Sequence, residues 1–158
     1  MKPSTGEKWD RLSFASTLYL CPILDTLLEH APAEMHDELR LGLQEALVNA
    51  AKHGNCLDPG KQVSVQYAEI HGDYWWIITD QGSGFDIPYE CEKCPEEQAN
   101  EGTYDCGRGL FILHQIFDQV HWSQKGNEVR LCKRWKRWPS FFKRLQNAWV
   151  ADEKMAVS

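Results

Sequence analysis

The segment 33–52 has the clearest period of an amphipathic helix in the chain, and it constrains the fold most. Its apolar residues recur at intervals of three and four, which places them on one helix face: Leu39, Leu43, Ala46, Leu47 and Ala50. Pro32 breaks the chain before this segment, and Gly54 follows it at the position of a helix C-cap. The apolar face of this helix must be covered by another layer of structure.

Three polar side chains follow the same helix at a strict spacing: Glu45, Asn49 and His53. Positions i, i+4 and i+8 point the same way along a helix, so a carboxylate, an amide and an imidazole share one stripe. Lys52 lies near that stripe. A polar stripe is usually a solvated face, but it can also line a pocket, and helix periodicity alone leaves both interpretations open.

Alternating apolar residues and turn signals predict five strands and further helices around this one. The strands are expected at 12–20, 62–71, 74–80, 120–124 and 128–135, and the helices at 22–31, at 110–117 and after Pro139. Gly72-Asp73 and Gly126-Asn127 mark hairpin turns between neighbouring strands. This order predicts an α+β fold, a two-layer sandwich in which helices cover one face of a mixed, mostly antiparallel sheet.

A chain of 158 residues fits one domain, which we expect at 1–135, followed by a basic, aromatic helix and tail at 136–158. The tail is typical of a helix that packs its aromatic face on the sheet; an anionic membrane surface or nucleic acid is the alternative. The net charge of −6 argues against nucleic acid as a direct partner. No apolar run approaches the roughly 20 residues that span a bilayer, and no signal segment opens the chain. We therefore expect a cytoplasmic protein whose six cysteines are mostly thiols.

Two glycine pairs lie on either side of a polar loop of about 20 residues, which is long for a compact domain. Asp80 ends an apolar strand, and Gly82 and Gly84 follow it. Gly107 and Gly109 come after the loop, where a helix is expected to begin. Taken singly, each pair is typical of a turn that needs positive φ.

The order and spacing of these motifs resemble those of the GHKL ATPases. The stretch EALVNAAKHGN resembles their N box, DQGSGFD their first glycine box and CGRGLFIL their second. Within that superfamily the match is to the small anti-sigma-factor serine kinases, and it runs from about Leu12 to Trp135. The resemblance implies the Bergerat ATP-binding fold, with ATP and Mg²⁺ as cofactors.

The resemblance also implies a role for each polar residue of the motifs. Asn49 supplies an amide oxygen, a hard ligand suited to Mg²⁺. Glu45, one turn earlier, orients or deprotonates the hydroxyl that attacks the γ-phosphate. Asp80 accepts a hydrogen bond from the adenine amino group.

The glycines of both boxes let the backbone approach the nucleotide without a Cβ: Gly82, Gly84, Gly107 and Gly109. The second pair would offer backbone N–H groups to phosphate at a helix start. Arg108 would pair with a phosphate or a protein partner, and Leu110 completes the second box. His53 has two interpretations, a phosphate contact or a hydrogen bond to its own helix end.

The loop between the glycine boxes would be the ATP lid. It contains Cys91 and Cys94 at CxxC spacing and ends with Cys106. Such a set predicts a Zn²⁺ site or a redox switch, with Cys56 or His114 as candidates for a fourth ligand. The alternative is three unlinked thiols in an acidic loop, and the resemblance requires no cysteines there.

The resemblance implies a partner switch. A homodimer presents one surface to a sigma factor and to a small anti-anti-sigma antagonist of the STAS type, which it phosphorylates. The alternative is a non-catalytic ATP-binding module that sequesters a regulatory partner, and the presence of Glu45 favours the kinase. The ATPase half of a histidine kinase is a weaker third hypothesis, because it needs a phosphoacceptor hairpin before the first strand.

Overall fold

The computed structural model describes residues 8–84 and 105–135, which form one antiparallel sheet covered by helices. In the described residues the sheet has five strands in the order β1-β2-β3-β5-β4, and all four neighbouring pairs are antiparallel. Their bounds are Asp10–Ala15 (β1), Gln62–Ile70 (β2), Asp73–Thr79 (β3), Gln119–Trp122 (β4) and Glu128–Arg134 (β5). Both predicted hairpins, β2–β3 and β4–β5, are confirmed.

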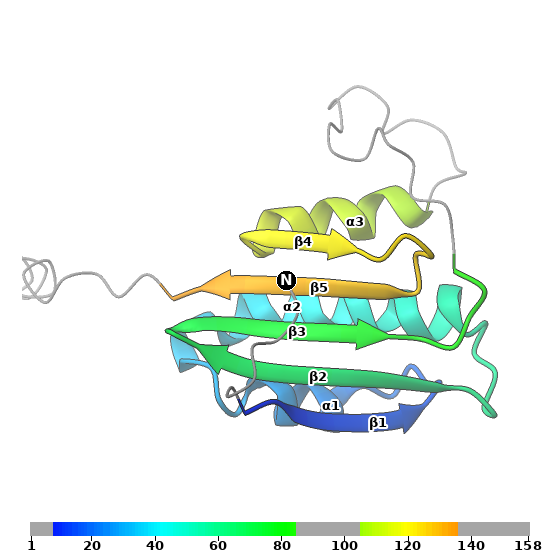
Figure 1. The fold of residues 1–158 in the computed structure, drawn as a ribbon, viewed down its shortest axis with the longest axis horizontal. Coiled ribbons are helices and arrows are strands. Elements are labelled where there is room, and N and C mark those ends of the chain that lie inside the picture. The colour runs from blue at the N-terminus through cyan, green and yellow to red at the C-terminus, as the bar shows by residue number, and fades with distance from the viewer. Residues whose placement is uncertain (1–7, 85–104, 136–158) are drawn as a thin grey trace, which may run out of the picture.

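The helices lie on one face of this sheet (Figure 1). They are α1 (Cys21–Leu28), the 3₁₀ turn η1 (Ala33–Met35), α2 (His36–Val48), the π-helical turn η2 (Asn49–Gly54) and α3 (Asp105–Ile116). The predicted two-layer α+β sandwich is thereby confirmed. No helix in the described ranges combines the length and the apolar character that a membrane crossing requires.

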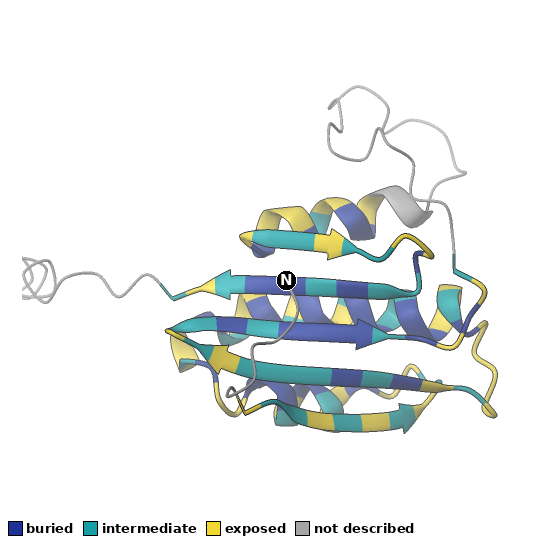
Figure 2. Ribbon diagram, viewed as in Figure 1, coloured by how far each residue is buried: buried dark blue, intermediate teal, exposed yellow. Residues whose placement is uncertain are grey.

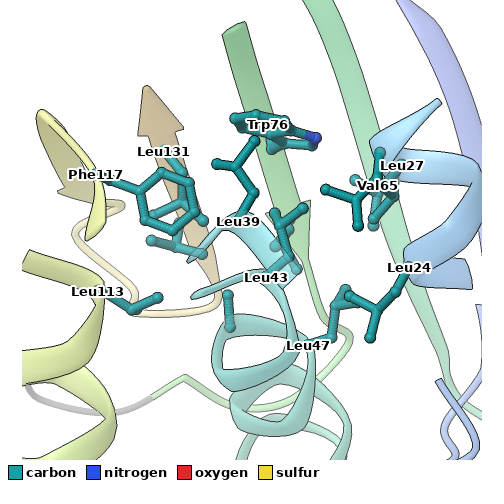
Figure 3. Close-up of a cluster of buried hydrophobic side chains, with 14 of the residues drawn as sticks. Leu24, Leu27, Leu39, Leu43, Leu47, Val65, Trp76, Leu113, Phe117 and Leu131 are labelled. Atoms are coloured by element: carbon teal, nitrogen blue, oxygen red, sulfur yellow. The ribbon is translucent and has the colours of Figure 1, made fainter. Parts of the chain in front are cut away.

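The hydrophobic core is formed by side chains of both layers. Figure 2 shows buried residues along α2 and along β2, β3 and β5. The predicted apolar stripe of the central helix is buried throughout: Leu39, Leu43, Ala46, Leu47 and Ala50. Figure 3 shows Leu39, Leu43 and Leu47 between α1 and the sheet residues Trp76 and Leu131. This burial, which removes apolar surface from water, is the main force that fixes α2 on the sheet.

Several predicted boundaries are wrong. The first strand covers Asp10–Ala15 rather than 12–20, since residues after Ala15 leave the sheet and α1 begins at Cys21. The first helix ends at Leu28 rather than near residue 31. The helix after the loop begins at Asp105 rather than at 110, so both glycines of the second box lie inside its first turns.

The predicted helix 33–52 is three helical pieces with different hydrogen-bond patterns, η1, α2 and η2. Gly54 is the last residue of η2 and is not a left-handed C-cap, because the left-handed residues come later, at Cys56 and Leu57. Most of the loop 81–106 and the whole segment 136–158 lie outside the described residues.

Candidate functional site

The polar stripe ends in the π-helical turn η2, whose last residue, Gly54, lies against Asp80 just after β3. The Asn55 N–H donates to the Ala50 carbonyl at 2.9 Å, five residues back, so the turn is wider than an α-helical turn. A Cβ on Gly54 would overlap the carboxyl group of Asp80. Glycine is therefore needed at position 54 for close approach to Asp80, and not for its φ angle. Short π segments inside helices are frequent at functional sites.

Asn55 fixes this arrangement from a fully buried position. Its Nδ2 donates to Oγ of Ser16 at 2.8 Å and to the carbonyl of Gln62 at 3.0 Å. Its Oδ1 accepts the N–H of Gln81 at 2.8 Å. The Asn55 side chain thus connects the end of η2 to three other segments, namely the residues after β1, the start of β2 and the residues after β3. Asn55 was not predicted as a site residue, because the sheet pairing brings its partners together.

Asp80 is the polar centre of the site. Its side chain is 7% exposed, and its Oδ1 accepts the Gly82 N–H at 2.8 Å. Burial raises the pKa of this carboxyl group, while the Gly82 hydrogen bond and the charges of Lys125 and Lys61 lower it. A carboxylate has about four acceptor positions on its two oxygens. One hydrogen bond leaves Asp80 with capacity to accept from a ligand.

The first glycine pair is required by packing around Asp80. A Cβ on Gly82 would overlap the Gly54 carbonyl oxygen. Gly84 has a φ of +83°, and a Cβ there would overlap the Lys125 carbonyl oxygen. The glycines thus hold the loop against η2 and the β4–β5 turn, and the proposed approach to a base stays a prediction.

Replacing Gly82 with alanine should destabilise the protein and disturb the site, because the clash at this position involves backbone that cannot rotate away. Forcing a methyl group into such packing costs about 1–3 kcal/mol. Thermal denaturation should show a lower midpoint for Gly82→Ala. Gly60→Ala is the matched control, because its nearest atom is the side-chain Oδ1 of Asp58 at 3.2 Å. Equal midpoints for the two variants would contradict this account of the first glycine box.

The second glycine box meets the polar stripe. A Cβ on the buried Gly109 would lie 3.1 Å from Oε2 of Glu45 and 3.6 Å from Nδ2 of Asn49. With glycine at this position, α3 packs directly beside the carboxylate and the amide. Leu110 is 5% exposed in the packed face of α3, and Arg108 is exposed. Gly107 lies in the first turn of the same helix.

A small cavity links the stripe to Asp80. Its volume is about 10 Å³, and its lining includes Asn49, Asp80, Trp122 and Asn127. This volume is close to the minimum that holds one water molecule. Two hydrogen bonds also join Asp80 to Asn127: the Asn127 carbonyl accepts the Asp80 N–H at 3.0 Å, and the Asn127 Nδ2 donates to the Asp80 carbonyl at 3.4 Å. Trp122 and Asn127 were not predicted as site residues, because the β4–β5 and β3–β5 pairings together bring them here.

Other predicted site residues do not join this cluster. His53 is exposed and is not among the described residues that line the cavity. Cys91 and Cys94 lie outside the described residues, as does the side chain of Cys106. The candidate fourth ligands, Cys56 and His114, are both exposed. The described residues contain no group of three or more metal-binding side chains, and the zinc site stays a prediction.

Comparison with known proteins supplies an independent finding. A family described as "histidine kinase-like ATPase domain" matches residues 20–133. The chain is 30% identical to "Serine-protein kinase RsbW" of Bacillus licheniformis over 92 residues, 53% of this chain and 54% of that protein. It is 26% identical to the protein of the same name from Bacillus subtilis (strain 168), again over 53% and 54% of the two chains. The chain thus spans about half the length of the curated relatives it matches.

Proposed function

We propose, because the chain belongs to the family of histidine kinase-like ATPase domains, that it binds ATP and transfers phosphate to a serine of a partner protein. The observation that carries this proposal is the close approach of Gly109 to both Glu45 and Asn49. It places the polar stripe of the N box against the second glycine box. The family match and the names of the relatives support the same reading.

The residues of the site fit a nucleotide with a bound metal ion. Asp80 offers a buried carboxylate to the amino group of adenine, and the backbone at Gly54 and Gly82 packs closely against that carboxylate. Asn49 offers an oxygen ligand of the kind that Mg²⁺ prefers. Gly109 lies beside it, and Gly107 lies in the first turn of α3, where backbone N–H groups and the helix dipole favour phosphate. The cavity of about 10 Å³ is too small for a nucleotide, so the ligand would lie outside it.

Glu45 is the residue that we assign to catalysis. ATP, when bound, supplies the phosphoryl group that is transferred. The Glu45 carboxylate lies one helical turn before Asn49, where it orients a serine hydroxyl and accepts its proton. Arg108, exposed on the same helix as Gly109, provides a cation for a phosphate or a partner.

The partners that we propose are a sigma factor and a small anti-anti-sigma antagonist, with this chain acting as a homodimeric, cytoplasmic switch. The GHKL resemblance supports this choice, and the relatives carry the name of a serine-protein kinase. The second candidate is a module that binds ATP and sequesters its partner without transferring phosphate. The carboxylate of Glu45 beside Gly109 favours the kinase, because a pure binder needs no base there.

A pull-down with and without Mg²⁺–ATP tests the proposed function. The full chain should retain a regulatory protein from a bacterial lysate, and nucleotide should change which protein it retains. Each retained protein is then incubated with the chain and radiolabelled ATP. Labelled phosphoserine on one of them supports the kinase. Retention that depends on ATP without any transfer to a retained protein identifies the binding module.

A further inference from the structure

A second and larger cavity lies at the end of the sheet opposite Asp80. Its volume is about 170 Å³, and residues of β1, β2, β3 and the end of α1 line it. The β3 residues in its wall, Tyr74, Trp75 and Trp76, come at the start of the strand, whereas Asp80 follows its end. The cavity is thus separate from the proposed nucleotide site and has no part in the proposed reaction.

The sheet gives this cavity an aromatic and acidic wall. Asp10 pairs with Tyr67 across β1 and β2, Tyr67 pairs with Trp76 across β2 and β3, and Glu69 pairs with Tyr74. Paired residues on antiparallel strands project to the same face of a sheet. Successive side chains alternate between faces, so all five share the face that the helices cover. Trp76, which is 2% exposed, is the most buried of the five, and its ring lies among the core side chains (Figure 3).

The end of α1 closes the other side of the cavity. The imidazole of His30 stacks on the ring of Tyr67, with 5.8 Å between the centroids, and the rings of Tyr74 and Trp76 are 6.4 Å apart. Leu27, at 1% exposure, belongs to the apolar floor. The carbonyl groups at the C-terminal end of a helix carry partial negative charge, which favours a cation beside them.

Carboxylates outnumber cations around the rings. Asp10 and Glu69 line the cavity together with one cation, Lys8. Burial raises the pKa of Tyr67, and the charges of Asp10 and Glu29 raise it further. The field at the rings is therefore negative, and aromatic faces add to it through their quadrupoles.

We propose that this cavity binds an organic cation, specifically a small alkylated ammonium group. Such a group is attracted to aromatic faces, and the attraction strengthens when the site is shielded from water. The acidic side chains compensate the charge, while the rings and Leu27 contact the alkyl surface. The volume of about 170 Å³ is smaller than the roughly 300–1,000 Å³ of drug-sized pockets, so the ligand is a head group of a few carbon atoms.

Calorimetry of the full chain with choline chloride tests this site. At pH 8, choline should bind saturably with a dissociation constant of about 1 mM or below. The control ligand is 3,3-dimethylbutan-1-ol, which has the same shape without the charge, and it should bind at least about tenfold more weakly. Equal binding of the two, or no binding of choline, would overturn the proposal.

Substitutions locate the binding on the molecule. Tyr67→Leu should weaken choline binding about tenfold, and Tyr67→Phe, which keeps the ring, should not. Tyr19→Leu is the matched control, because this tyrosine is 72% exposed and lies outside the cavity. Glu69→Gln, at an exposed position where the fold is not at risk, should weaken binding roughly twofold. Unchanged affinity in both Tyr67→Leu and Glu69→Gln would place the binding elsewhere and refute the assignment.

Discussion

Glu45→Ala should abolish phosphate transfer and leave ATP binding intact. The substitution removes the proposed base but no proposed metal ligand, and alanine is a good helix former in α2. Loss of a positioned general base typically lowers a rate about 10²–10⁴-fold. The measurement is single-turnover transfer of labelled phosphate to the retained partner, with ATP affinity measured in parallel. Gln44→Ala, at an exposed position one residue earlier on the same helix, is the matched control and should transfer normally.

The partner protein should still bind to Glu45→Ala. The variant would then keep the sigma factor bound, because it cannot phosphorylate the antagonist. Asn49→Ala should behave differently and weaken both Mg²⁺–ATP binding and transfer, because it removes the proposed metal ligand. Transfer by Glu45→Ala at the rate of the wild type would show that Glu45 is not the base. If neither the wild type nor Glu45→Ala transfers phosphate to any bound partner, the chain is not a kinase for these partners.

Asp80→Asn should lose ATP affinity by about tenfold to a hundredfold. The Oδ1 of asparagine can still accept the Gly82 N–H, so the local fold should survive. The other carboxylate oxygen is replaced by an NH₂ group, which is a donor and would face the donor amino group of adenine. An unpaired buried polar group costs about 1–3 kcal/mol. Asp58→Asn, the same exchange in an exposed loop, should leave the affinity unchanged, and equal affinities of all three proteins would contradict the role of Asp80.

Asp80→Asn should also change how the stability of the protein depends on pH. Burial raises the pKa of Asp80 above its ordinary value of 3.8, so the folded state binds this proton more tightly than the unfolded state. Protonation of Asp80 therefore stabilises the folded state. This contribution is fully present below the pKa that Asp80 has in the unfolded state, and it is lost as the pH rises through the pKa that Asp80 has in the folded state. Thermal midpoints should therefore fall less between pH 4 and neutrality in ligand-free Asp80→Asn than in the wild type. An identical pH dependence in both proteins would show that burial does not perturb Asp80.

The sequence predicts the layers of the fold well and its helix ends poorly. The apolar stripe of α2 and the β2–β3 hairpin rest on local periodicity and a Gly72 turn with a φ of +87°, and local patterns suffice for both. The change from α2 to the π turn η2 is invisible to periodicity, because one wider turn shifts the stripe by less than a residue. Gly54 looks like a helix C-cap in the sequence, yet it is needed because of Asp80, which is distant in the chain.

The sequence predicts the site residues that belong to the motifs, but it does not predict those whose positions depend on strand pairing. Glu45, Asn49 and Gly109 belong to recognisable boxes, and the structure brings these three together. Asn55 ends the stretch that resembles the N box and Asn127 belongs to a predicted turn, but neither was predicted as a site residue, because their places depend on hydrogen bonds across β2, β3 and the β4–β5 turn. The aromatic cavity has the same origin, because its wall depends on the registers of β1, β2 and β3.

Calorimetric comparison of ATP with GTP on the unmodified chain tests the central claim most directly. The claim is that the buried carboxylate of Asp80 recognises the base of the nucleotide. Adenine presents a donor amino group where guanine presents a carbonyl oxygen, which a carboxylate repels. A site built around such a hydrogen bond discriminates strongly, so Mg²⁺–ATP should bind at least about a hundredfold more tightly than Mg²⁺–GTP. Equal affinities, or no binding of either nucleotide, would contradict the account.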